Sequence, residues 1–405
     1  MNLKPIILTS AALALGISPA STKPLKIYVL AGQSNMQGHA AVQTLAGIGS
    51  DPETKALHDK FADAEGNPRT FDDVRMAALS GKLDEPTTKN GPLTVGFGGN
   101  LDGQPGTTGK NVLKFGPELG FGVTMREHLK EPFLIIKTAW GGKSLRKDFL
   151  SPSGVPVVGG DAVTGAHYQA MVDHVRAVLK DPAKFVPGYD PKQGIEMAGF
   201  VWFQGWNDMM GAKDPFYQAT EEKPAFAAYS ELLAHFIRDV RKDFNAPKMP
   251  FVIGVIGTSG KSDEKNPFRA AMAAPAALPE FKGNVTAVHS SEYYDEKLGE
   301  LVDRSWRWQR PAWDPENKYA ELREKLAPLQ KQMEEGKKLP TQAERAKVHW
   351  DTQKQMTDIT YSKEEQEYLK MNQSNQGYHY HGSGKILGRI GEAFAKALIT
   401  MNKQP

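Results

Sequence analysis

The feature that most constrains the fold of this chain is a regular alternation between short apolar runs and amphipathic segments. Each apolar run is nearly continuous and only a few residues long, which is typical of strands buried on both faces. The apolar runs are Leu25–Leu30, Phe133–Ile136, Gly199–Phe203, Phe251–Ile256 and Val285–Val288, and the segments with helical spacing are Pro117–Lys130, Tyr168–Leu179, Tyr229–Phe244 and Ser383–Ile399. This alternation predicts an α/β fold, a three-layer α/β/α sandwich with a mainly parallel sheet. Functional sites in such folds lie at the carboxyl ends of the strands.

Two regions depart from this alternation. Residues 41–112 are rich in Gly, Asp, Thr and Pro and show little periodicity, so we expect long ordered loops above the sheet. Residues 315–370 are highly charged and favour helix, which indicates a solvated helical insertion rather than a binding arm. The sequence therefore predicts a single domain over residues 21–405 that carries a charged helical insertion at about 315–370.

The first twenty residues have the pattern of an export signal. One cation, Lys4, precedes an apolar run at Ile6–Ile17, and the small residues Ser18-Pro19-Ala20 follow. This is the order of a signal peptide, and the run is shorter than the roughly 20 apolar residues that span a bilayer. We expect residues 1–20 to be removed and the mature protein to be exported, to the periplasm or the medium.

Composition excludes several classes of function. The net charge of +3 comes from 50 basic and 47 acidic residues without a dense basic block, so nucleic acid is not an expected partner. The chain has no cysteine, which excludes disulfides, thiolate catalysis and cysteine-ligated zinc. It also has no His-Glu-x-x-His or similar ligand set, so no metal or organic cofactor is expected.

Polar clusters follow three of the predicted strands. Ser34 lies in a tight turn directly after the first strand, in Gly32-Gln33-Ser34-Asn35-Met36. A serine in such a turn has its hydroxyl exposed at the sheet edge, which suits a nucleophile, although Gly, Ser and Asn also form ordinary turns. The second cluster is Lys137-Thr138-Ala139-Trp140-Gly141-Gly142-Lys143-Ser144, and the third is Trp202-Phe203-Gln204-Gly205-Trp206-Asn207-Asp208.

The second and third clusters offer groups that could bind an oxyanion. A glycine N–H in the second cluster can approach a ligand closely, unless the glycines only form a turn. The Asn207 side chain can present its NH₂ to a developing negative charge. Asp208 is interpreted as a helix cap or turn residue rather than a catalyst. Substrate contacts are predicted for Gln33, Gln204, Trp140 and Trp206, since aromatic faces stack on sugar rings.

A serine nucleophile needs a base, and two histidines are candidates. His379 and His381 lie in a loop just before the last predicted helix, whereas His128, His174 and His235 fall inside predicted helices. A late loop histidine that reaches an early serine is the arrangement of a Ser-His pair. In an extended segment both side chains would lie on the same side, so His381 would line the cleft as well. The neighbouring rings of Tyr378 and Tyr380 could fix the plane of the His379 imidazole.

Taken together, these blocks resemble the sialate O-acetylesterase and acetylxylan esterase group of the SGNH hydrolase superfamily. Ser34 matches the first block, Gly141 or preferably Gly142 the second, and Gly205-Trp206-Asn207-Asp208 the third. The Tyr-His-Tyr-x-Gly-Ser pattern makes His379 the preferred match to the last block and His381 the alternative. The superfamily's Asp-x-x-His is absent, because Gln376 and Tyr378 occupy the positions three residues before the two histidines. The orienting acid therefore either comes from elsewhere or is replaced by a backbone carbonyl.

The resemblance implies an exported esterase that removes acetyl groups from a carbohydrate through a Ser-His acyl-enzyme. The Ser34 N–H, the Gly142 N–H and the Asn207 side chain would hold the oxyanion. A lipase or thioesterase on the same scaffold is one alternative and would need a wide apolar groove. A non-catalytic glycan-binding protein is another, favoured only by the missing acid. The identity of the acetylated sugar and the oligomeric state stay open.

Overall fold

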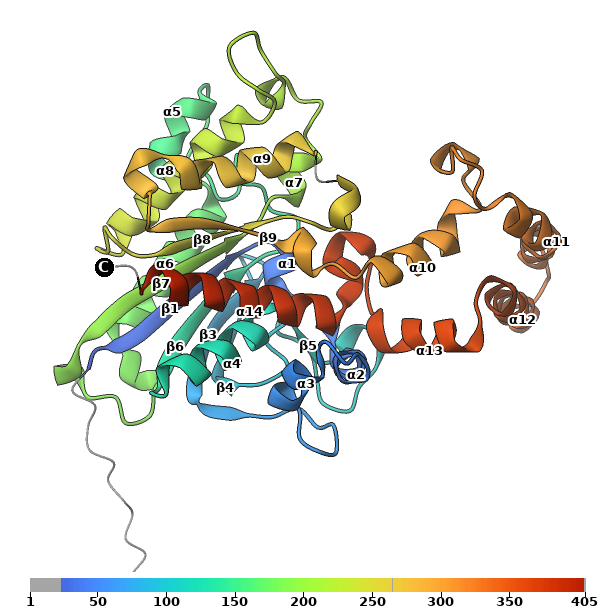
Figure 1. Ribbon diagram of the computed structural model, residues 1–405, viewed down its shortest axis with the longest axis horizontal. Coiled ribbons are helices and arrows are strands. Elements are labelled where there is room, and N and C mark those ends of the chain that lie inside the picture. The colour runs from blue at the N-terminus through green and yellow to red at the C-terminus, as the bar shows by residue number, and fades with distance from the viewer. Residues whose placement is uncertain (1–22, 264, 404–405) are drawn as a thin grey trace, which may run out of the picture.

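The computed structural model describes residues 23–263 and 265–403, so the predicted signal peptide lies outside the described residues. Within them, seven strands form one sheet in the order β4-β3-β6-β1-β7-β8-β9 (Figure 1). All neighbours in this sheet pair in parallel except β3 and β4. Its strands are β1 (Leu25–Gly32), β3 (Phe71–Gly81), β4 (Pro86–Leu93), β6 (Phe133–Ala139), β7 (Ile195–Phe203), β8 (Phe251–Val255) and β9 (Val285–His289). The predicted α/β fold with a mainly parallel sheet is confirmed.

Helices surround this sheet, and two very short strands, β2 (Ala40–Ala41) and β5 (Lys114–Phe115), pair beside it. The longer helices are α4 (Pro117–Leu129), α6 (Ala166–Lys180), α8 (Ala227–Asp243), α10 (Glu296–Arg307), α11 (Ala320–Gly336), α12 (Gln342–Thr360), α13 (Lys363–Asn372) and α14 (Gly384–Met401). The shorter ones are α1 (Ser34–Gln37), α2 (Leu45–Ser50), α3 (Lys55–Phe61), α5 (Val155–Val158), α7 (Trp206–Met209) and α9 (Pro267–Ala273).

The central strand β1 contributes to a hydrophobic core on each face of the sheet. Ile27 and Val29 pack into one core with α6 and α8, whereas Tyr28 and Leu30 pack into the other with α4 and α14. This alternation follows from the two-residue repeat of a strand and explains why the run is apolar throughout. Helices α4 and α14 approach closely, since a Cβ added at Gly391 would lie 2.0 Å from the Pro117 carbonyl oxygen.

The expectation of long loops over residues 41–112 is wrong in part. This region supplies β3, which pairs with β6, and β4, which forms the edge of the sheet. The apolar pattern of β3 is interrupted by Asp72 and Asp73 near its start. An edge strand needs no continuous apolar run, and β4 has the polar sequence PTTKNGPL with mostly exposed or half-buried residues. The hydrophobic pattern therefore gave no signal for this hairpin.

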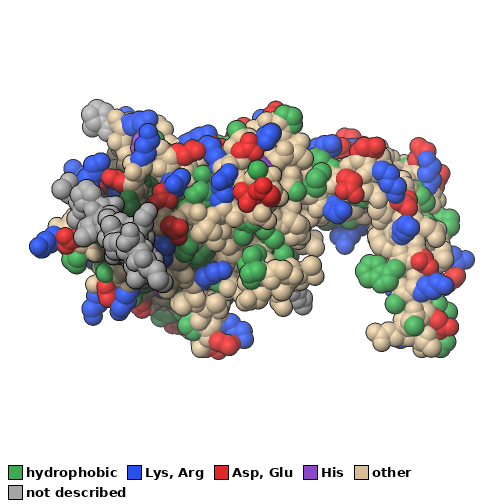
Figure 2. Space-filling view, turned by 90° about the horizontal axis from the view of Figure 1, so that it is seen from below, with side chains coloured by type: hydrophobic (Ala, Val, Ile, Leu, Met, Phe, Trp, Pro, Cys, Tyr) green, Lys and Arg blue, Asp and Glu red, His purple; other side chains and the backbone are tan. Residues whose placement is uncertain are grey.

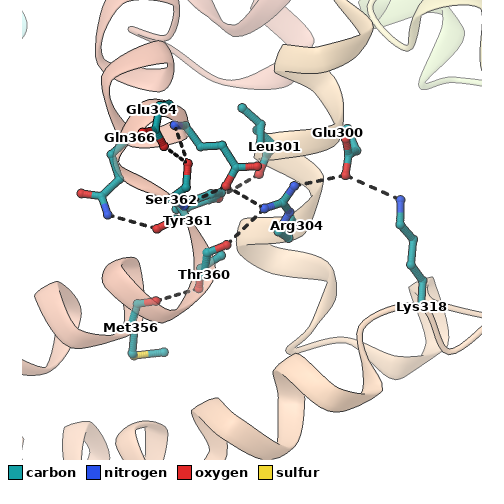
Figure 3. A network of polar contacts seen from close by, with 11 residues as sticks. Glu300, Leu301, Arg304, Lys318, Met356, Thr360, Tyr361, Ser362, Glu364 and Gln366 are labelled. Atoms are coloured by element: carbon teal, nitrogen blue, oxygen red, sulfur yellow. Dashed lines mark hydrogen bonds and ion pairs between the residues drawn. The ribbon is translucent and has the colours of Figure 1, made fainter.

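The charged segment 315–370 consists largely of α11 and α12, which pair with each other and extend away from the sheet as an arm (Figure 1). Figure 2 shows open space between this arm and the body. The root of the arm is held by Arg304 on α10, which donates to the Thr360 carbonyl at 3.2 Å and pairs with Glu365 at 3.0 Å (Figure 3). The Tyr361 hydroxyl adds a bond to the Leu301 carbonyl at 2.8 Å. No helix in the described part of the chain is both long and apolar enough to cross a membrane.

Candidate active site

Three predicted site loops meet at the carboxyl edge of the central strands. Ser34 follows β1, Gly141 follows β6 and Asn207 follows β7, and these strands are neighbours in the sheet. All three residues line one cleft of about 1110 Å³, and His379 lines it as well. The cleft lies at the carboxyl end of β1, where the chain first passes to β3 and β6 on one side and then crosses from β6 to β7 on the other. Open α/β sheets place their ligands at such a switch in strand order.

The turn that carries Ser34 is fixed by close packing and by one buried amide. A Cβ at Gly32 would lie 2.1 Å from the Phe203 carbonyl oxygen, so only glycine allows β1 and β7 to approach here. The Gln33 side chain is buried; its oxygen accepts the Gly205 N–H at 3.0 Å and its NH₂ donates to Asn207 Oδ1 at 3.1 Å. The first and third loops are thereby joined directly beside Ser34.

The two glycines after β6 lie at different places around Ser34. A Cβ built on Gly141 would lie 3.7 Å from the Ser34 Cβ, so Gly141 packs directly against the serine. The Gly142 carbonyl accepts a bond from Asn207 Nδ2 at 3.0 Å. An amide nitrogen has two hydrogens, so the second one is available for a ligand. The backbone N–H of Ser34 begins helix α1, where N–H groups have no partner within the helix.

The side chain that orients His379 is Asn375. The Asn375 Oδ1 accepts the Gln376 backbone N–H at 2.8 Å and lies 2.9 Å from His379 Nδ1. Because an amide oxygen can only accept, Nδ1 carries the proton of the neutral ring, and Nε2 is left as the basic nitrogen. The backbone N–H groups of Ser374 and Asn375 both bond to the His381 carbonyl, which closes the loop around His379.

A second ring fixes the plane of the His379 imidazole. His39 stacks on it with the ring centroids 4.1 Å apart and the planes 13° apart. Tyr378 contacts the same ring edge-on at 4.4 Å. Burial, followed by the charge of Lys114, lowers the pKa of His379 to about 4, and burial is also the main reason why the pKa of His39 falls to about 3. Both rings are therefore neutral at physiological pH.

The expectations for Tyr380 and His381 are wrong. Tyr380 is fully buried, and its hydroxyl accepts the Gly257 N–H at 2.9 Å instead of its ring contacting His379. His381 is buried as well and bonds through Nε2 to the Tyr294 hydroxyl at 2.8 Å, away from the cleft. The reason is the backbone, since Tyr380 and His381 have φ values of 51° and 58°. Left-handed residues break the alternation of an extended segment, so the two histidines point to different places.

A buried ion pair supports the floor of the cleft. Lys137 Nζ contacts Glu118 Oε2 at 2.6 Å and donates to the carbonyls of Gln37 and Phe97, each at 2.8 Å. Burial lowers the pKa of Lys137, while the Glu118 carboxylate opposes this. The lysine thereby holds the end of α1, the helix that begins with Ser34. The Gln37 amide adds a bond to Ser80 Oγ at 2.8 Å.

Other predicted residues of the third cluster lie beneath the cleft rather than on its wall. Gln204 is buried, and its NH₂ donates to the Lys143 carbonyl at 2.9 Å. Asp208 is buried too and accepts from the N–H groups of Leu145 and Arg146 and from the Tyr217 hydroxyl. Burial raises the pKa of Asp208, and these donors oppose the shift. Asp208 therefore fastens the second loop to the third. It is not the helix cap that the sequence predicted, because it lies within α7 and Gly205 stands at the N-cap position.

The walls of the cleft combine aromatic and charged side chains. Trp206 and Tyr378 lie with ring centroids 5.8 Å apart, and Trp140 also lines the cleft although it is largely buried. The charged residues that line the cleft are Lys82, Asp84, Glu85, Asp102 and Lys143. Such a lining differs from the wide apolar groove that a lipase would need. In the described part of the chain, no group of three His, Asp or Glu side chains could hold a metal ion.

Comparison with known families identifies the class of protein. Residues 24–298 match the family model of carbohydrate esterases described as sialic acid-specific acetylesterases. The chain belongs to this family. The matched residues include Ser34, both glycine candidates and Asn207, whereas the loop of His379 follows the matched region. A comparison with curated proteins gave no significant match.

Solved structures of low similarity include members of the same broad class. A protein from Arabidopsis thaliana is 19% identical with a TM-score of 0.37, and the match covers 66% of this chain and 86% of that one. A carbohydrate acetylesterase from Xanthomonas citri is 14% identical with a TM-score of 0.38, covering 69% and 55%. A carbohydrate esterase family 2 enzyme with a carbohydrate-binding domain, from Corynascus thermopiles (Myceliophthora fergusii), is 12% identical with a TM-score of 0.28, covering 67% and 57%.

The sequence interpretation of this esterase missed two residues of the site. Asn375 stands four residues before His379 and is not an acid. The superfamily pattern places an acid three residues before the histidine, so it gave no signal for this side chain. His39 stands five residues after Ser34, and a histidine so close to a predicted nucleophile was a signal that could have been used. Its stacking partner is distant in sequence, and only the folded chain brings the rings together.

Proposed function

We propose that this protein is an exported serine esterase that removes O-acetyl groups from carbohydrates, with Ser34 as nucleophile and His379 as base. The observation that carries the proposal is the cleft that contains both residues, in which Asn375 occupies Nδ1 of His379 and leaves Nε2 free to accept a proton. Membership in the carbohydrate esterase family supports the acetyl ester as the bond that is cleaved. Export is proposed from the pattern of residues 1–20 alone.

The proposed reaction has two steps. His379 Nε2 takes the proton of Ser34 Oγ as this oxygen attacks the acetyl carbonyl carbon, and the N–H groups of Ser34 and of Gly141 or Gly142 stabilise the oxyanion together with Asn207 Nδ2. The tetrahedral intermediate then expels the sugar alkoxide, which receives the proton from His379 and leaves an acetyl-serine. Water attacks this ester with His379 again as base, and acetate leaves.

The test is acetate release from acetylated xylan and turnover of p-nitrophenyl acetate by the purified protein. Ser34→Ala should abolish both activities and leave the thermal unfolding curve unchanged. Ser144→Ala is a matched control, because Ser144 also lies in a loop near the cleft but bonds to Asp148. Turnover by Ser34→Ala at the wild-type rate would exclude Ser34 as nucleophile. For export, the secreted protein should begin near Ser21 by mass spectrometry, and a secreted chain that retains Met1 would contradict the signal peptide.

A further inference from the structure

The loop that carries His379 contains three successive residues in the left-handed region. Tyr380, His381 and Gly382 have φ values of 51°, 58° and 60°. Only the last of them is glycine, and other residues enter this region singly because Cβ then crowds the following carbonyl. Such strained backbone persists only where its surroundings hold it, and it is concentrated at functional sites. Contacts from outside the loop must therefore keep this turn in place.

The Tyr380 hydroxyl lies at the ends of β8 and β9, two strands from which the sequence predicted no site residue. It accepts the Gly257 N–H at 2.9 Å and lies 2.6 Å from Ser290 Oγ. Ser290 gives its own hydrogen to the Val255 carbonyl at 2.6 Å, so the Tyr380 hydroxyl is the donor to Ser290. Both side chains are fully buried, and bulk water cannot replace these bonds.

The surroundings of this hydroxyl leave little room for adjustment. A Cβ at Gly257 would lie 2.2 Å from the Ser291 backbone nitrogen, so the ends of β8 and β9 are in close contact. The Tyr380 ring packs against Phe203, the last residue of β7, with the ring centroids 6.0 Å apart. The ring is thus placed by β7 and the hydroxyl by β8 and β9, which ties the left-handed turn to three strands of the sheet.

The turn passes its position on to His379 through the His381 carbonyl. This oxygen accepts the backbone N–H groups of Ser374 and Asn375 at 2.8 and 2.9 Å. The Asn375 side chain in turn lies 2.9 Å from His379 Nδ1. A change of φ at Tyr380 would move the His381 carbonyl, and Asn375 and the imidazole would lose their places with it.

We propose that Tyr380 and Ser290 are positioning residues for the base, because the bond between their hydroxyls holds the turn that keeps His379 in the cleft with Ser34. The inference rests on the proposed function, since it assumes that His379 is the base. Neither Tyr380 nor Ser290 lines the cleft, so neither contacts the substrate. Loss of the bond should therefore lower kcat and leave KM for a small ester nearly unchanged.

The first variant is Tyr380→Phe, which removes the hydroxyl and keeps the ring. It should lower kcat for p-nitrophenyl acetate by about 10- to 100-fold, the usual effect of a small misplacement of a catalytic group, with KM within about twofold of wild type. The relaxed loop exposes the imidazole. Because burial is the main cause of the low pKa of His379, the acid limb of kcat/KM should move to higher pH.

The matched control is Tyr168→Phe on helix α6. Tyr168 is also buried, and its hydroxyl bonds to Asp243 at 2.6 Å, away from the loop of His379. This variant likewise loses one buried hydroxyl, so its thermal stability should fall as well. Its kcat and its acid limb should nevertheless stay at the wild-type values.

Ser290→Ala tests whether the two hydroxyls act as one unit. Alone it should lower kcat by a smaller factor than Tyr380→Phe, because Tyr380 keeps its bond to the Gly257 N–H. The double variant should lose no more kcat than Tyr380→Phe, since substitutions within one hydrogen-bond network are not additive.

The outcomes separate this role from the proposed function. Wild-type kcat and acid limb in a folded Tyr380→Phe would overturn the positioning role, and if that variant does not fold, wild-type kcat in Ser290→Ala would do so. Losses that multiply in the double variant, or an equal loss of kcat in Tyr168→Phe, would overturn it as well. Unchanged kcat in His379→Ala would instead contradict the esterase mechanism itself.

Discussion

Replacing Asn375 measures how much an uncharged hydrogen-bond acceptor at Nδ1 contributes to the action of His379 as a base. Asn375→Ala removes the oxygen that lies 2.9 Å from His379 Nδ1, and Asn375→Asp puts a carboxylate in nearly the same place. Gln376→Ala is the control, because the Gln376 side chain is exposed while its backbone N–H keeps its own position in the loop. Both Asn375 variants change the group that faces the imidazole, whereas the control keeps it.

The expected loss of kcat in Asn375→Ala is moderate, because the hydrogen bond between Asn375 and His379 joins two neutral groups. A hydrogen bond between neutral groups contributes about 0.5–1.5 kcal/mol, and a donor left unpaired in a buried site costs about 1–3 kcal/mol. His379 is half-buried, so we expect kcat to fall by about 10- to 100-fold. In a Ser-His-Asp triad the aspartate holds the tautomer of the histidine and also stabilises the charged imidazolium, and its replacement costs about 10⁴-fold. The present site has no such charge to lose.

For Asn375→Asp we expect a shift in pH dependence. An adjacent carboxylate favours the protonated imidazole, so it raises the pKa of His379 above its present value of about 4. Because kcat/KM falls when the base is protonated, the acid limb of the profile should move to higher pH. The stabilised imidazolium should also keep kcat at or above the wild-type value at neutral pH.

The assay is the pH profile of kcat/KM for p-nitrophenyl acetate between about pH 4 and pH 9. Gln376→Ala should follow the wild-type profile. The reasoning would be refuted by an Asn375→Ala variant with activity within about twofold of wild type, or by an Asn375→Asp variant whose acid limb moves to lower pH.

Three further predictions concern the surroundings of the site. Lys137→Met should lower the free energy of unfolding by about 3–5 kcal/mol in guanidinium chloride titrations, because Glu118 is left buried without its cation. The double variant with Glu118→Gln should recover part of this loss. A smaller loss in the single variant would contradict the role of the pair. His39→Ala should lower kcat by up to about tenfold, whereas His39→Phe keeps a ring stacked on His379 and should stay near the wild-type kcat. Equal losses of kcat in the two variants would show that stacking is not the contribution of His39. The pKa values of about 3 for His39 and about 4 for His379 and His381 lie below the ordinary 6.5, so unfolding binds protons below about pH 6.5. Stability should therefore be full above that pH and fall toward pH 4 by up to about 1.4 kcal/mol per pH unit for each histidine; a flat melting temperature over this range would contradict it.

The central strands could be predicted because burial on both faces leaves a strong pattern. The apolar run at Leu25–Leu30 is uninterrupted since its side chains enter two cores, and β1 was found where the run indicated. The edge strand β4 could not be found in this way, because exposure on its outer side removes the need for apolar residues.

Some residues of the site could likewise be predicted from the strand pattern, and others could not. Ser34, Gly142 and Asn207 each follow a recognisable strand, so the topology of a parallel sheet was sufficient to predict that they line one cleft. The surroundings of His379 depend on two left-handed residues, Tyr380 and His381, that are not glycines. Their conformation is imposed by tertiary contacts such as the bond to the Gly257 N–H, and such contacts leave no local signal.

The arm interrupts the chain between the body and the final helix, and this has a consequence for connectivity. Helix α14 is held against α4 by close packing at Gly391, and Arg304 and Tyr361 fasten the root of the arm. The loop of His379 is therefore positioned by these contacts and not by the covalent path through α11 and α12. A single proteolytic nick in the turn between those helices, at residues 337–341, should leave two fragments that copurify and still hydrolyse esters. The same turn is a natural point for a split enzyme, in which activity reports the association of two separately expressed halves.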